Sequence, residues 1–222
     1  MTQKTGTLGL PAGIVGIIFD CDGVLIDSRA ANMEYYNRIR TKAGFAPMNE
    51  EEEAYAHMHS SREALAHIFP PALHGRLVEF ASAVNYKREI MPLIEPMPGL
   101  YDCLDSLANQ GLRLGVLTNR GRRGIELVLD SFDLQDRFDP ILTAEDVREK
   151  PAPDGLLRTA DHWACTPKEL VFVGDSLLDA QSAQAAGVCF LAYDNLKLHA
   201  HGHLNSFTQL EQAIGIQAAN FT

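Results

Sequence analysis

The stretch from Ile14 to Ser28, IVGIIFDCDGVLIDS, constrains the fold more than any other part of the chain. It starts with β-branched and other apolar residues, which predict a buried strand, and two acids, Asp20 and Asp22, follow where that strand should end. Open parallel sheets bind their ligands at the carboxyl ends of the strands. Two acids one residue apart, followed by Gly23, therefore predict a metal or phosphate site at the edge of such a sheet. The alternative is an Asp-Gly turn with both acids in water.

Apolar strands alternate with helical patterns after residue 96. Strands are predicted over residues 113–117, 140–142, 170–173 and 188–192, and helices over 100–109, 124–131, 153–163 and 177–186. This alternation implies a parallel sheet covered by helices on both faces, so the expected fold class is α/β and Rossmann-like. The segment from Gly215 onward carries no signal that predicts an element.

Between the first strand and residue 96 the alternation stops. Helices are predicted over residues 28–42, 50–58, 61–69 and 73–91, separated by turn or capping signals, and no strand is convincing. An all-helical insertion between the first two strands of an α/β domain forms a second structural unit. We therefore expect an α/β core at 1–27 and 96–222, and an inserted helical domain at 28–95.

Composition limits the classes of partner. The 222 residues are 46% hydrophobic and 22% charged, as expected for a soluble globular protein. The 19 Lys and Arg against 29 Asp and Glu give a formal net charge of −10, which repels nucleic acid and anionic membranes. Neither is therefore an expected partner, and no protein partner is implied. An anionic substrate would have to be met by locally clustered positive groups and a cation.

The cysteines and the N-terminal segment indicate in which cellular compartment the protein is expected. The four cysteines show no C-x-x-C spacing and fall mostly within predicted apolar elements, which predicts buried thiols in a reducing compartment. Residues 1–13 contain one Lys and an early Pro11, and they resemble neither a signal peptide nor a membrane span. We expect a cytoplasmic protein.

Three further polar stretches accompany the first one. Thr118-Asn119 follows the apolar run 112–117, Lys150-Pro151 lies in a polar loop, and GDSLLD at 174–179 follows the apolar run 170–173. The ordered set resembles the haloacid dehalogenase-like (HAD) superfamily of phosphohydrolases, whose motifs are DxDG(T/V), a Ser or Thr, a Lys and GD(S/T)xxD. The resemblance covers nearly the whole chain and is closest to phosphoglycolate phosphatase and β-phosphoglucomutase-like members. It implies that the helical insertion is the cap of this family.

The resemblance also implies a chemistry and a metal. Asp20 would attack phosphorus and form an aspartyl-phosphate, and Asp22 would act as general acid and then as general base. Acids this close together, beside a phosphate dianion, need a hard divalent cation, and Mg²⁺ fits. The implied ligands are the Asp20 carboxylate, the backbone carbonyl of Asp22, and Asp175. Asp179, one turn into the following helix, would face the same site behind these ligands, or else lie on a solvated helix face.

The remaining motif residues are expected to bind the phosphoryl group. Thr118 offers a hydroxyl, the amide of Asn119 can donate to the same oxygens, and Lys150 would hold Asp20 and the phosphate in line. Gly23 would let the chain turn sharply so that backbone amides approach the phosphate. Only its place in the motif order distinguishes Lys150 from a solvated loop lysine.

The insertion is expected to select the substrate. Its SRE stretch at 61–63 resembles the specificity loop of β-phosphoglucomutase-like proteins, and Arg62 could clamp a remote carboxylate, phosphate or hydroxyl. The alternative is an arginine at an exposed helix start. His57 and His59 lack the partners and spacing of a zinc site. Lys87 and Arg120 either add positive potential at the rim of the site or are simply solvated.

Three functions stay open at this point. The first is a phosphatase of a small phosphorylated metabolite, and the second is a mutase that returns the phosphoryl group to a sugar phosphate. Both use the same residues and differ in how well the closed cap excludes water, which a sequence does not show. The third is a binding protein on a degenerate scaffold, against which the complete motif set argues.

Overall fold

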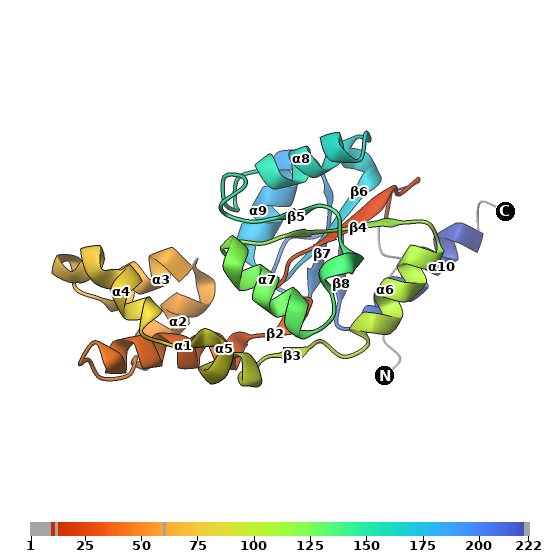
Figure 1. Ribbon diagram of the computed structural model, residues 1–222. Coiled ribbons are helices and arrows are strands. Elements are labelled where there is room, and N and C mark those ends of the chain that lie inside the picture. The colour runs from red at the N-terminus through yellow and green to blue at the C-terminus, as the bar shows by residue number, and fades with distance from the viewer. Residues whose placement is uncertain (1–9, 12, 60, 220–222) are drawn as a thin grey trace, which may run out of the picture. The chain divides into compact units, whose positions relative to one another are not determined.

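The computed structural model describes residues 10–11, 13–59 and 61–219, apart from the side chains of residues 57, 58 and 215–219, and it contains two compact units. One unit is formed by Met1–Leu25 with Pro96–Thr222, and the other by Ile26–Glu95. The sequence predicted the second unit over 28–95. Figure 1 labels most of the helices and strands of both units.

The first unit is built on a six-stranded sheet with the order β5-β4-β1-β6-β7-β8, in which every neighbouring pair is parallel. Its strands are β1 Gly16–Phe19, β4 Arg113–Leu117, β5 Ile141–Leu142, β6 Leu170–Gly174, β7 Cys189–Tyr193 and β8 Gly202–Leu204. Counted along the chain, this is the order 3-2-1-4-5-6 of a doubly wound sheet, whose binding crevice lies at the switch point between the first and fourth strands. Here those strands are β1 and β6.

The register of the central strands brings the motif loops to one edge. Phe19 lies opposite Val116 of β4 and Val173 of β6, so the residues that follow these three strands emerge at the same end of the sheet. Asp20 follows β1, and Thr118 and Asp175 follow β4 and β6. The predicted parallel α/β sheet is confirmed.

Helices cover both faces of this sheet (Figure 1). They are α6 Leu100–Asn109, α7 Arg122–Ser131, α8 Asp154–His162, α9 Leu177–Ala186 and α10 Phe207–Ala219, with the short 3-10 helices η3 Gln135–Arg137 and η4 Pro167–Glu169. Successive strand residues point to opposite faces. Ile18 joins a buried cluster with Trp163 and with Ala183 of α9, whereas the ring of Phe19 lies 6.2 Å from that of Phe207 in α10.

Most predicted elements of this unit are found within two residues of their expected bounds, but β8, α10 and the two 3-10 helices were not predicted. β8 has three residues, two of them Gly and His, and is too short to show a periodicity. Helix α10, which runs from Phe207 to Ala219, was not predicted, and residues 215–219, in which no signal was found, form its last turn. Phe207, Leu210 and Ile214 are buried, and this spacing of three and four residues is the signal that could have found the helix.

The second unit is helical. It contains α1 Arg29–Lys42, α2 Glu50–Met58, α3 Ser61–Ile68, α4 Leu77–Ser82 and α5 Tyr86–Glu89, with 3-10 helices η1 Pro71–Arg76 and η2 Met91–Leu93. The chain enters and leaves through two short paired strands, β2 Ile26–Asp27 and β3 Glu95–Pro96, which were not predicted.

The prediction of a single helix over residues 73–91 was wrong. Four short helices occupy this stretch, because Asn85 leaves the helical path and caps a new helix by accepting the N–H of Arg88 at 3.1 Å. A buried arginine joins α1 to the rest of this unit: Arg40 donates to Glu52 of α2 and to the carbonyl of Ile68 in α3, both at 2.7 Å.

Two further expectations concern buried free thiols and the absence of a membrane span. Cys21, Cys103 and Cys189 are buried and Cys165 is half-buried, and all four are free thiols. None of the helices among the described residues combines the length and the apolar character that crossing a membrane requires.

Candidate active site

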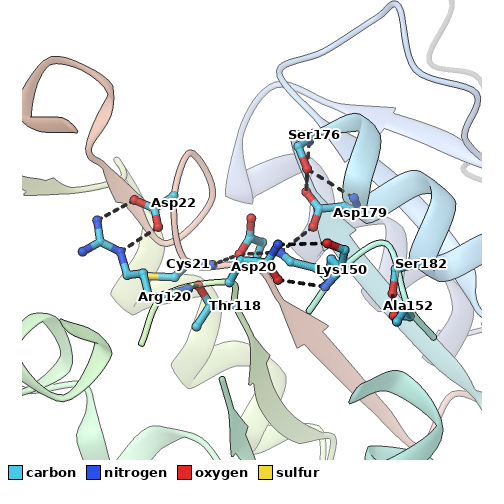
Figure 2. Close-up of polar contacts among 11 residues, drawn as sticks. Asp20, Cys21, Asp22, Thr118, Arg120, Lys150, Ala152, Ser176, Asp179 and Ser182 are labelled. Carbon is cyan, nitrogen blue, oxygen red and sulfur yellow. Dashed lines mark hydrogen bonds and ion pairs between the residues drawn. The ribbon is translucent and has the colours of Figure 1, made fainter. Parts of the chain in front are cut away.

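Asp20 lies at the centre of the site, directly after β1. Its N–H donates to the carbonyl of Val173 at 2.9 Å, which extends the pairing of β1 with β6 and fixes the backbone. Its side chain is 8% exposed. Oδ1 accepts the N–H of Cys21 at 2.6 Å and forms an ion pair with Lys150 Nζ at 2.9 Å. Figure 2 shows the carboxylate pointing toward Lys150.

Lys150 lies between two carboxylates. Its Nζ is 2.9 Å from Asp20 Oδ1 and 2.6 Å from Asp179 Oδ1, and all three side chains are buried. Burial by itself would lower the pKa of the Lys150 ammonium, but the charges of Asp179 and Asp20 outweigh it and raise the pKa above its ordinary range. The loop that carries Lys150 is tied to α9, where Ser182 Oγ donates to the carbonyl of Ala152 at 2.9 Å.

Asp179 owes its orientation to a local helix cap. Ser176 is the N-cap of α9: its Oγ accepts the N–H of Asp179, and its own backbone N–H donates to Asp179 Oδ2, to which the Ser176 hydroxyl also donates. This reciprocal arrangement is a capping box, which the S-x-x-D spacing favours. Because Oδ2 is held by Ser176, Oδ1 points to Lys150. The side chain is fully buried, so Asp179 does not lie on a solvated helix face.

Three acids converge at this edge of the sheet. Asp20, Asp175 and Asp179 each offer a carboxylate oxygen, and these oxygens all lie within 4.8 Å of one another. Burial and the charge of Asp179 raise the pKa of the Asp175 carboxyl to about 7, and burial raises that of Asp20 as well. One lysine does not neutralise three such groups. A set of hard oxygen donors with excess negative charge suits a divalent cation such as Mg²⁺.

Asp175 is positioned by two contacts that sequence reasoning missed. Asn195 Nδ2 donates to its backbone carbonyl at 2.8 Å. Gly23 has a φ of +74°, and a Cβ at this position would lie 2.0 Å from Asp175 Oδ2. Gly23 therefore provides both the turn after Asp22 and the space that the Asp175 carboxylate occupies.

Thr118 and Asn119 follow β4. Thr118 is buried, and its Oγ1 accepts the N–H of Arg120 at 3.1 Å. The side-chain amide of Asn119 contacts the backbone of Lys150 at both ends: Nδ2 donates to the Lys150 carbonyl at 3.0 Å and Oδ1 accepts its N–H at 2.8 Å. This side chain holds Lys150 in place, a role that was not predicted.

Asp22 stands apart from the three converging acids. Its carboxylate forms a two-pronged ion pair with Arg120, in which Nε donates to Oδ2 and a terminal nitrogen donates to Oδ1, both at 2.6 Å (Figure 2). Arg120 is therefore a partner of a motif acid and not simply a solvated charge. Its position directly after Thr118-Asn119 is the sequence signal that could have indicated this.

The residues predicted to select the substrate lie in the other unit. Arg62 is the second residue of α3 and is exposed, as is Lys87. The ring of His59 stacks on Tyr55 with centroids 3.7 Å apart, and its Nδ1 contacts the Tyr55 carbonyl. The side chain of His57 lies outside the described residues. The contact of Arg62 with substrate stays a prediction.

Comparison with known proteins was made at three levels. The family model of haloacid dehalogenase-like hydrolases matches residues 17–193. A phosphoglycolate phosphatase of Shigella boydii is 30% identical over 198 residues, covering 78% of this chain and 79% of its own. One from Synechococcus elongatus is 27% identical over 177 residues, covering 79% and 82%.

Solved structures are similar over almost the whole chain. A HAD-superfamily hydrolase of subfamily IA from Geobacter sulfurreducens has a TM-score of 0.75 and 36% identity, and the match covers 94% of this chain and 98% of the other. A HAD family hydrolase from Deinococcus radiodurans, with bound phosphate and sodium, has a TM-score of 0.69 at 19% identity, over 93% and 97%. The resemblance indicated by the four motifs is confirmed.

Proposed function

Since the chain belongs to the haloacid dehalogenase-like hydrolases, we propose that it is a Mg²⁺-dependent phosphatase of a small phosphomonoester, acting through an aspartyl-phosphate on Asp20. The expectation of a hydrolase is confirmed by the family. The observation that carries the finer proposal is the ion pair of Lys150 Nζ with Asp20 Oδ1, at the point where Asp175 and Asp179 also converge. Curated relatives named phosphoglycolate phosphatase support the same reaction class.

The first step is an in-line displacement at phosphorus. Because Asp20 Oδ1 already accepts from Cys21 and Lys150, we assign the attack to Oδ2. A bond forms between this oxygen and phosphorus while the ester P–O bond breaks. Asp22, in its protonated form, gives its proton to the leaving oxygen, which departs as an alcohol. Lys150 keeps the nucleophile oriented throughout.

The second step returns the enzyme to its starting state. A water oxygen attacks phosphorus of the aspartyl-phosphate, and the Asp22 carboxylate, now a general base, takes one proton of that water. The bond between phosphorus and Asp20 breaks, inorganic phosphate leaves, and the Asp20 carboxylate is restored. Asp22 is again protonated for the next cycle.

Several groups of this chain are placed to donate hydrogen bonds to the negatively charged phosphoryl oxygens. Thr118 Oγ1 accepts from Arg120, which leaves its own hydroxyl hydrogen to donate to the phosphoryl group. Since the side-chain amide of Asn119 binds Lys150, we assign the phosphoryl contact to its main-chain N–H. The residues suited to hold Mg²⁺ are Asp20, Asp175 and the backbone carbonyl of Asp22, with Asp179 behind them. When bound, Mg²⁺ would neutralise the phosphoryl oxygens and the ligand carboxylates.

The test compares Asp20→Asn with wild type in phosphate release from small phosphate esters, with and without Mg²⁺. We expect Asp20→Asn to abolish turnover and wild type to lose it when Mg²⁺ is chelated. Asp194→Asn is a matched control, because Asp194 is an exposed acid that follows β7. Substantial turnover in folded Asp20→Asn would refute the nucleophile assignment.

A sugar-phosphate mutase is the second candidate, favoured by the SRE stretch at 61–63. It would return the phosphoryl group of the same aspartyl-phosphate to a sugar phosphate, and an isomerisation assay primed with a bisphosphate detects it. In either case we propose a small phosphorylated metabolite as substrate and a cytoplasmic location.

Selection of that substrate is assigned to Arg62. Arg62→Ala should reduce activity on preferred esters more than on a generic aryl phosphate, whereas Arg88→Ala, at another exposed arginine of the same unit, should change neither. An equal loss on all esters would remove Arg62 from this role.

A further inference from the structure

We propose that Arg120 is the positioning residue of Asp22, which fixes the carboxyl group that exchanges a proton with the leaving oxygen. This inference rests on the function proposed above, because it assumes that Asp22 is the general acid. Neither the motifs nor the comparisons assign a role to Arg120. The proposal is carried by the geometry of its pair with Asp22.

The contact is a rigid one. Two parallel N–H···O bonds of 2.6 Å join the two side chains, and a planar guanidinium fork matches both oxygens of one carboxylate. In the ionised form of Asp22, such a pair fixes the direction of the carboxyl plane as well as its distance, which a single lysine ammonium does not. In the protonated form that acts as general acid, the oxygen that carries the proton no longer accepts from Arg120, and the other oxygen keeps its hydrogen bond to the guanidinium. The Arg120 side chain is 12% exposed and that of Asp22 is 32% exposed, so the pair is partly shielded from water.

The backbones of Asp22 and Arg120 are both held by the sheet. Asp22 lies in the loop after β1 and Arg120 in the loop after β4, and these strands are hydrogen-bonded neighbours. The Arg120 N–H donates to Thr118 Oγ1, so its backbone is tied to the buried residue that directly follows β4. On the other side, the positive φ of Gly23 turns the chain directly after Asp22. The pair therefore links two motif loops across the edge of the sheet.

The position of Asp22 matches the need of an in-line reaction. The nucleophile and the leaving oxygen lie on opposite sides of phosphorus, so a general acid must be held away from the nucleophile. Asp22 is not among the three converging acids. In Figure 2, Asp22 and Arg120 lie on one side of Asp20, and Lys150 and Asp179 lie on the other. Without its partner, the half-exposed Asp22 side chain would sample several rotamers, and few of them would suit proton transfer.

The experiment uses the leaving-group dependence of general acid catalysis. Glycerol phosphate has a poor leaving group that needs a proton, whereas p-nitrophenyl phosphate has a good one that does not. Asp22→Asn should lower kcat/KM on glycerol phosphate by roughly 10²- to 10⁴-fold and much less on the aryl ester. This comparison tests the proposed role of Asp22 as general acid independently of Arg120. Equal losses on the two esters would overturn the role of Asp22, and that of Arg120 with it.

Arg120→Met should then show the same pattern with a smaller loss. We expect kcat/KM on glycerol phosphate to fall by about 10- to 100-fold and kcat/KM on the aryl ester to fall much less, because kcat/KM reports the step in which the ester bond breaks. Arg120→Lys, which keeps the charge without the fork, should recover only part of the loss. Arg123→Met is the matched control, since Arg123 is an exposed neighbour in α7 and should leave both activities unchanged.

A double variant shows whether Arg120 acts through Asp22. If it does, Asp22→Asn with Arg120→Met should have the same ratio of alkyl to aryl activity as Asp22→Asn alone. A further multiplicative loss would overturn the proposal. So would a rise in KM confined to phosphoglycolate, which would mean that Arg120 binds the substrate carboxylate directly.

Discussion

The side chain of Asn119 forms two hydrogen bonds with the backbone of Lys150: Nδ2 donates to the Lys150 carbonyl, and Oδ1 accepts the Lys150 N–H. The two residues are 31 positions apart, and this contact joins the loop after β4 to the loop that carries the buried lysine. Since Lys150 forms an ion pair with Asp20, Asn119 supports the proposed nucleophile indirectly, through the backbone of Lys150.

We expect Asn119→Ala to lower both activity and stability. The loss of two hydrogen bonds to a part-buried backbone should reduce the free energy of unfolding by roughly 1–3 kcal/mol. Displacement of Lys150 should lower kcat by about 10-fold or more. Denaturant unfolding and steady-state kinetics measure the two effects. Asn205→Ala, at an exposed asparagine, controls for the substitution itself. Unchanged kcat in Asn119→Ala would show that Lys150 needs no such support.

Removing the charge of Lys150 should be costly for folding. Lys150→Met leaves Asp20 and Asp179 buried without their partner, and breaking such a pair costs roughly 3–5 kcal/mol. Adding Asp179→Asn should recover part of this loss, because one of the orphaned charges is then absent. Chemical denaturation of the single and double variants tests this. Strictly additive losses would contradict the coupling.

Gly23→Ala separates a steric effect from backbone strain. The new Cβ would lie 2.0 Å from Asp175 Oδ2, at a φ of +74°. Gly111 has a φ of +79°, and no atom of the described residues lies within 4 Å of the place its Cβ would take, so Gly111→Ala carries the strain alone. We expect both variants to lose about 1–2 kcal/mol of stability, but only Gly23→Ala to lose Mg²⁺-dependent activity. Titration of Mg²⁺ in the phosphatase assay distinguishes them, and equal Mg²⁺ dependence would refute the proposed clash with Asp175.

The raised pKa of Asp175 predicts how pH affects the metal-free protein. Its pKa rises from 3.8 to about 7 on folding, so between these values the folded state holds a proton that the unfolded state has lost. The free energy of unfolding should therefore fall as pH rises through this window, and the loss is complete above about pH 7. Mg²⁺ should restore stability at about pH 8, since a bound cation favours the ionised carboxylate.

Thermal unfolding in chelator at about pH 5 and about pH 8 measures the effect. Asp175→Asn has no carboxyl at this position, so its midpoint should change less between the two pH values, and added Mg²⁺ should stabilise it less. A variant that kept the full pH dependence of wild type would show that other groups cause it.

Local patterns explain which parts of the fold could be predicted. Helix α9 was predicted with correct bounds because Ser176 and Asp179 are only three residues apart and cap it within the same segment. Helix α5 was missed because its start depends on Asn85 interrupting an otherwise helical pattern. The edge strand β8 is defined mainly by its pairing with β7, which a short sequence of Gly and His does not reveal.

The amino-acid sequence by itself determined the alternation of strands and helices, and hence which loops end at the carboxyl edge of a parallel sheet. That much follows from apolar periodicity and from turns, which act over a few residues. The tertiary structure decided which polar groups pair at this edge. Asn119 binds the backbone of Lys150, and Arg120 binds Asp22 across 98 positions of the chain. Such choices depend on distances between loops of different strands, and only the register of the assembled sheet sets those distances.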